Sequence, residues 1–102
     1  MVLSGLFQTY RNNWRRLRDE LSRLGAEVEQ WSYADLNRPA EAQPPIHRLV
    51  AGVPAYFQID SYDHLPSGDL TICIDAHGGP PTPLGIKPSY HFYKRRDGSV
   101  YY

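Results

Sequence analysis

Apolar side chains recur every three or four residues over the first part of the chain. The set comprises Leu3, Leu6, Tyr10, Trp14, Leu17, Leu21 and Leu24. This spacing places one apolar face along an α-helix of about six turns. Ser4 is a candidate N-cap and Gly25 a candidate stop, so the sequence predicts a helix over residues 4–24.

The segment after this helix carries a weaker pattern. Residues 26–31 suit either a short strand or a further helical turn, and we favour the strand, at a sheet edge where Glu27 and Glu29 oppose further pairing. Residues 37–45 contain three prolines and no periodicity, so they predict a surface linker.

Apolar and polar side chains alternate through most of the remaining chain. This period of two predicts an antiparallel β-meander over residues 46–102. The candidate strands cover residues 46–50, 55–62, 70–76, 90–95 and 99–102. Turns are predicted at Leu65–Gly68, with Pro at its second position, and at Asp97-Gly98, a strong hairpin signal.

The apolar positions of two neighbouring strands also predict their register. Ile59 should pair with Ile74 and Phe57 with Ala76, because a slip of one residue would turn the apolar set toward water. The predicted fold class is therefore α+β. One long N-terminal amphipathic helix packs on one face of an antiparallel β-sheet of about four to five strands, in a single domain covering residues 1–102.

Composition adds an abundance of aromatic side chains to this picture. Eight Tyr, three Phe and two Trp are many for 102 residues. Tyrosine suits half-buried sheet positions and contact surfaces, because it joins an apolar body to a polar tip. We therefore expect tyrosines on the sheet face that the helix leaves open.

Charge argues against a dedicated nucleic-acid-binding protein. The formal net charge is zero, whereas affinity for nucleic acid rests mainly on the neutralisation of phosphates. The basic residues are nevertheless clustered, with five arginines between Arg11 and Arg23 and a second group at Lys94, Arg95 and Arg96.

The single cysteine, Cys73, excludes an internal disulfide and suits a reducing compartment. Residues 1–5 lack the features of a signal peptide, and no apolar run approaches the ~20 residues of a membrane span. We therefore expect a cytoplasmic protein with no membrane contact.

The second sheet face carries the residues that could bind a metal ion or take part in catalysis. The predicted register gathers Gln58, Asp60, Tyr62, Cys73, Asp75 and His77 there, joined by His91 and Tyr93 if the last hairpin pairs with this sheet. Asp75, His77 and His91 are the candidate ligands of a metal site. A polar, solvent-facing sheet surface accounts for the same residues, so we expect no cofactor. Cys73 lacks the surroundings of a nucleophile.

Residues 77–88 form a long connection with four prolines and three glycines. The prolines reduce the freedom of the unfolded loop, which favours a shaped loop. No Lys-Ser/Thr follows its glycines, so it is not a P-loop. This loop could either contact a partner protein or only connect two strands, and the sequence does not distinguish the two.

The sequence favours a small non-enzymatic, cytosolic protein-interaction module, of the kind represented by bacterial immunity proteins and other regulatory proteins that bind a partner protein. The expected partner-binding residues are Tyr56, Tyr62, Tyr93, Tyr101, Arg95, Pro80 and Pro81.

Two other functions are open. Single-stranded RNA binding would use the Arg-rich helix together with the aromatic strands, and a small metal-dependent hydrolase would use Asp75 and His77. A homodimer is also expected to be feasible through the strand edge at Ser99–Tyr102.

Overall fold

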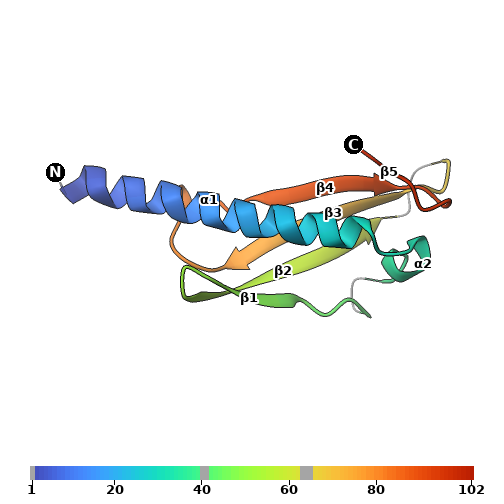
Figure 1. The fold of residues 1–102 in the computed structure, drawn as a ribbon, viewed down its shortest axis with the longest axis horizontal. Coiled ribbons are helices and arrows are strands. Elements are labelled where there is room, and N and C mark those ends of the chain that lie inside the picture. Colours follow the sequence, from blue (N-terminus) through green and yellow to red (C-terminus); the bar gives the residue numbers. More distant parts are fainter. Residues whose placement is uncertain (1, 40–41, 63–65) are drawn as a thin grey trace.

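The computed structural model describes residues 2–39, 42–62 and 66–102, with residues 2–4 described by their backbone alone. Within these ranges, two α-helices precede a five-stranded antiparallel sheet (Figure 1). The elements are α1 (Val2–Glu29), α2 (Tyr33–Leu36), β1 (Ile46–Val50), β2 (Val53–Tyr62), β3 (Leu70–Gly78), the 3-10 turn η2 (Pro83–Gly85), β4 (Ser89–Lys94) and β5 (Val100–Tyr101). The strands lie in the sheet in the same order as in the sequence.

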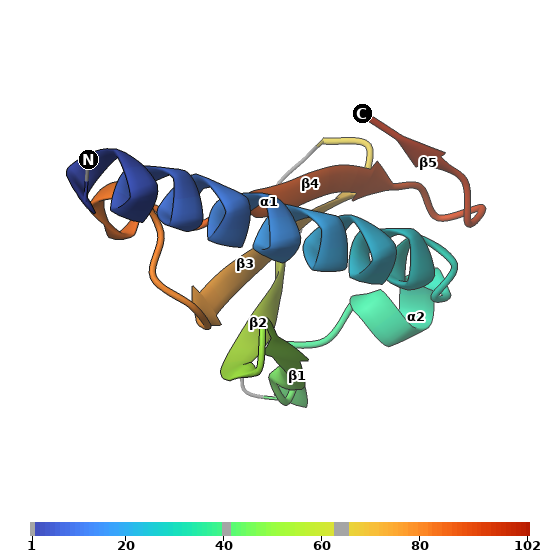
Figure 2. The ribbon, with the colours of Figure 1, turned by 60° about the vertical axis from the view of Figure 1, so that its left-hand side comes forward.

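The predicted fold class is confirmed. Helix α1 crosses one face of the sheet, and α2 lies beside the end of α1 (Figure 2). The strand boundaries lie within two residues of the predicted ones. The turn expected at Leu65–Gly68 begins at a residue outside the described part of the chain.

The predicted register of β2 and β3 is also confirmed. Ile59 pairs with Ile74 and Phe57 with Ala76. All four side chains are buried, together with Phe92 from β4. The apolar side of the sheet therefore faces α1, as the alternation of side chains requires.

The apolar face of α1 is buried only over its second half. Leu17, Leu21, Leu24 and Val28 lie in the core, whereas Leu6 remains 47% exposed. In Figure 1 the first turns of α1 project beyond the sheet, so this part of the helix has no strand beneath it.

Both predicted ends of α1 are wrong. The helix includes Ser4, and it continues past Gly25 to Glu29, so the short edge strand expected over residues 26–31 does not form. Two observations explain the longer helix. Gly25 faces the ring of Tyr90, where a Cβ atom would lie only 2.6 Å from the ring carbons, and Val28 extends the buried face by another turn. Gly25 thus permits close packing of α1 on β4.

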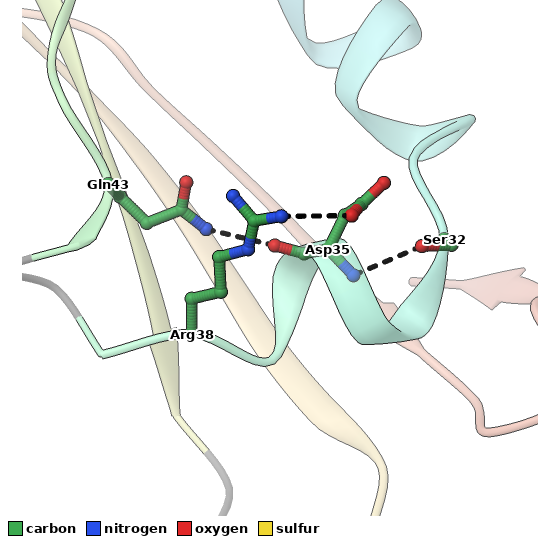
Figure 3. A network of polar contacts seen from close by, with 4 residues as sticks. All are labelled: Ser32, Asp35, Arg38 and Gln43. Atoms are coloured by element: carbon green, nitrogen blue, oxygen red, sulfur yellow. Dashed lines mark hydrogen bonds and ion pairs between the residues drawn. The ribbon is translucent and has the colours of Figure 1, made fainter.

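The connection between the helices and the sheet is held by a small polar network (Figure 3). The Ser32 hydroxyl caps α2 by accepting a hydrogen bond of 3.0 Å from the Asp35 amide. The Asp35 carboxylate pairs with Arg38 at 3.1 Å. The Gln43 side chain donates to the Asp35 carbonyl at 3.2 Å. Residues 40–41 of the expected linker over 37–45 lie outside the described residues, but its two flanks are joined by these contacts.

Candidate functional site

The sheet face that points away from α1 gathers polar and aromatic side chains from all five strands. We call it the open sheet face. Strand register and burial place on it His47, Tyr56, Gln58, Asp60, Tyr62, Thr71, Cys73, Asp75, His77, Ser89, His91, Tyr93 and Tyr101. It includes four of the predicted partner-binding residues and the three candidate metal ligands.

Three rings form one aromatic cluster on this face, which we call the Tyr56 cluster. His47 pairs with Tyr56 across β1 and β2, and Tyr56 pairs with His77 across β2 and β3. The rings of Tyr56 and His77 stack with centroids 4.9 Å apart and planes 16° from parallel. The ring of His47 lies 6.1 Å from that of Tyr56. Cross-strand ring pairs of this kind hold each other in one orientation.

A second cluster lies where β4 pairs with β5, and we call it the Tyr93 cluster. Tyr93 and Tyr101 are cross-strand partners, and their rings stack with centroids 4.9 Å apart. The guanidinium of Arg95 sits 4.2 Å from the centroid of the Tyr101 ring, a cation–π contact. The Tyr101 hydroxyl donates to the Asp69 carboxylate at 2.7 Å, and this hydrogen bond raises the pKa of Tyr101.

Acidic groups and a thiol occupy the middle of the open sheet face. Cys73 pairs with Asp60 on one side and with His91 on the other. Burial raises the pKa of the Cys73 thiol, and the carboxylates of Asp75 and Asp60 raise it further. Asp60 is also the main cause of the raised pKa of Tyr62. The local field therefore favours a protonated, weakly nucleophilic thiol.

The candidate metal ligands share the face but do not converge. Asp75 and His77 lie on β3, and His91 lies opposite Cys73 on β4. Over residues 2–39, 42–62 and 66–102, no three His, Cys, Asp or Glu side chains stand close enough to hold a metal ion.

The proline-rich loop runs to α1 instead of the open sheet face. The Asn13 side chain donates to the Pro81 carbonyl at 2.8 Å, and the Lys87 ammonium donates to the Pro80 carbonyl at 3.2 Å. Gly79 lies against Leu17 of α1. The predicted site residues Pro80 and Pro81 are therefore separated from Tyr56, Tyr62, Tyr93, Tyr101 and Arg95.

The two basic groups of the sequence do not form one surface with the aromatic strands. The helix arginines lie on α1, which covers the opposite side of the sheet (Figure 2). Lys94 is only 3% exposed and points to the core side. Of the second basic group, Arg95 is the residue that contacts an aromatic ring of the open sheet face.

Sequence reasoning missed His47. The signal for it was the two-residue turn at Ala51-Gly52, because such a turn fixes the register of the strands that it joins. Counting back from this turn places His47 opposite Tyr56.

Searches against protein-family models, curated proteins and solved structures found no match to this chain. None of the helices in the described part of the chain combines the length and apolar character needed to cross a membrane.

Proposed function

We propose that this chain is a cytoplasmic domain that binds a partner protein through the open sheet face. The observation that carries the proposal is the pair of stacked clusters, Tyr56 with His77 and Tyr93 with Tyr101. Rings that already hold one another lose little side-chain entropy when a partner covers them. Tyr and Arg are also the residue types most often found at binding hot spots.

The charges of the face favour a protein over RNA as the partner. Asp60 and Asp75 lie near its middle, where a phosphate backbone would meet repulsion. The arginines that RNA binding would require lie on α1, on the other side of the sheet. We expect the partner to place a basic side chain near the two carboxylates and apolar groups over the rings.

Within this class we infer a regulatory role of the immunity type, in which the domain covers and blocks its partner. The features of the face that support this proposal are the stacked rings, the Arg95 guanidinium 4.2 Å from the centroid of the Tyr101 ring, and the raised pKa of the Cys73 thiol, which disfavours nucleophilic chemistry. Self-pairing through β5 is less favoured, because β5 spans only Val100–Tyr101 and offers few backbone groups to a second copy.

The test compares variants of the two clusters against a partner recovered by affinity purification from the organism that encodes the chain. Tyr56→Ala and Tyr93→Ala should each weaken binding of the purified partner at least tenfold in isothermal titration calorimetry. Arg16→Ala, an exposed change on α1, serves as the control and should bind as the wild type does. Equal affinity of folded cluster variants and wild type would refute the proposal.

A further inference from the structure

A second surface lies at the other side of the molecule, where α1 extends past the sheet. The proline-rich loop runs beside this part of the helix (Figure 2), and η2 contacts it. Between them is an open groove of about 420 Å³, within the range of about 300–1,000 Å³ found for ligand sites. We call it the helix–loop groove. It is lined by Arg11, Trp14, Arg15, Arg18, Pro83 and Ile86.

The two elements that form the helix–loop groove also carry exposed apolar side chains, of which Ile86 lines the groove itself. Leu6 and Phe7 of α1 are 47% and 57% exposed, and Leu84 and Ile86 of the loop are 94% and 60% exposed. Exposed apolar side chains gathered in one region mark an interaction site more often than scattered ones do. The region is therefore a candidate for contact with another molecule.

The loop side of the groove combines a strained backbone conformation with hydrogen bonds that hold the loop in place. Leu84 has φ 55°, a left-handed conformation that is unfavourable for a bulky apolar residue. The loop is held in place by Asn13 at Pro81 and by Lys87 at Pro80. A strained backbone that displays an apolar side chain to solvent offers no gain in stability, and such strain clusters at functional sites.

The helix side supplies two arginines, Arg11 and Arg15, that have no ion pair within the part of the chain that the structure describes. Residues 1–18 contain four arginines and no Asp or Glu. Neither Arg11 nor Arg15 forms an ion pair or a side-chain hydrogen bond with any residue that the structure describes. Arg18 lies 5.6 Å from the centroid of the Trp14 ring and pairs with Asp19. The groove thus joins an apolar wall to uncompensated positive charge.

We propose that the helix–loop groove binds a segment of a partner protein in which Asp or Glu side chains stand beside large apolar ones. Charge complementarity at Arg11 and Arg15 selects the acidic groups, and Trp14 with Ile86 accommodates the apolar ones. This site is distinct from the open sheet face and does not depend on it.

Two other occupants fit the groove less well. A symmetric dimer formed through this groove would bring the arginines of one α1 against those of another, and like charges oppose that contact. An anionic membrane would match the charge, but the Trp14 and Ile86 side chains line a hollow, which a peptide side chain fills and a flat lipid surface does not.

The test uses a phage library of random dodecapeptides, selected on the full chain. Enriched peptides should carry Asp or Glu within four residues of Trp, Phe or Leu. In fluorescence polarisation with such a peptide, Arg15→Glu should weaken binding at least tenfold. Arg23→Glu makes the same charge change elsewhere on α1 and should leave the affinity unchanged, as should Tyr93→Ala on the open sheet face.

Leu84→Asn provides a variant that retains the fold, because Asn adopts the left-handed conformation readily. It should also weaken peptide binding several-fold. The proposal is overturned if the enriched peptides lack acidic residues, or if Arg15→Glu and Leu84→Asn bind as tightly as wild type. It is equally overturned if the groove residues mediate binding to phosphatidylserine vesicles or self-association in analytical ultracentrifugation, in place of peptide binding.

Discussion

The ammonium group of Lys94 donates a hydrogen bond of 2.7 Å to the main-chain oxygen of Glu29. Lys94 comes from β4, and Glu29 is the last residue of α1. The last turn of α1 has no basic side chain of its own. A cation from the sheet therefore satisfies a carbonyl at the negative end of the helix dipole, which explains why a lysine is buried here.

Replacement of Lys94 by Met should lower the free energy of unfolding by about 1.5–3 kcal/mol, because the partly buried Glu29 carbonyl would lose its charged hydrogen-bond donor. Urea unfolding followed by circular dichroism measures this change. Lys87→Met, at a half-buried position away from the helix end, should have a smaller effect. A Lys94→Met protein as stable as wild type would show that the contact contributes nothing.

The contact between Gly25 and Tyr90 leads to a second prediction. Helix propensity alone would make Gly25→Ala favourable by up to about 1 kcal/mol. The new methyl group would lie 2.6 Å from the Tyr90 ring, however, and this overpacking should prevail, lowering stability by about 1–3 kcal/mol.

Gly5→Ala is the matched control for Gly25→Ala. Gly5 lies in the same helix, and a Cβ atom there would meet nothing within 4 Å apart from its chain neighbours and the adjacent backbone of the helix. This change should leave stability equal or raise it by up to about 1 kcal/mol. Similar effects at both positions in thermal unfolding would argue against close packing of α1 on β4.

Gly25 also shows where sequence reasoning reaches its limit. A glycine after an apolar helical face suits both a helix end and a close contact inside a helix. The two cannot be told apart without Tyr90, which lies far along the chain. The register of Ile59 with Ile74 was predictable because strand alternation and a shared apolar face are local signals.

The same distinction applies to the candidate surfaces. The open sheet face followed from alternation, which placed Gln58, Asp75 and His77 together on it; the pairing of Tyr56 with His77 extends the same register by one more pair on this face. The exposure of Leu6 was not predictable, because it depends on where the sheet ends beneath α1. The path of the loop toward Asn13 was likewise set by tertiary contacts alone.

The Cys73 thiol should react slowly with iodoacetamide at neutral pH. The reactive form is the thiolate, and burial together with Asp75 and Asp60 raises the pKa of the Cys73 thiol. The reaction rate should therefore increase with pH, and the midpoint of this increase should lie at a higher pH than that of a free cysteine. Asp75→Asn should shift this midpoint to lower pH by removing a negative charge, whereas Asp97→Asn should not. A midpoint below that of a free cysteine would contradict this description of the face.

The agreement between strand order and sequence order has a kinetic consequence. Each strand pairs with the next one along the chain, so the sheet can grow by successive closure of neighbouring segments. Helix α1 instead packs against β4, and that contact closes most of the polypeptide into a single loop. We therefore expect the meander to form early on the folding pathway and the docking of α1 to complete the native state.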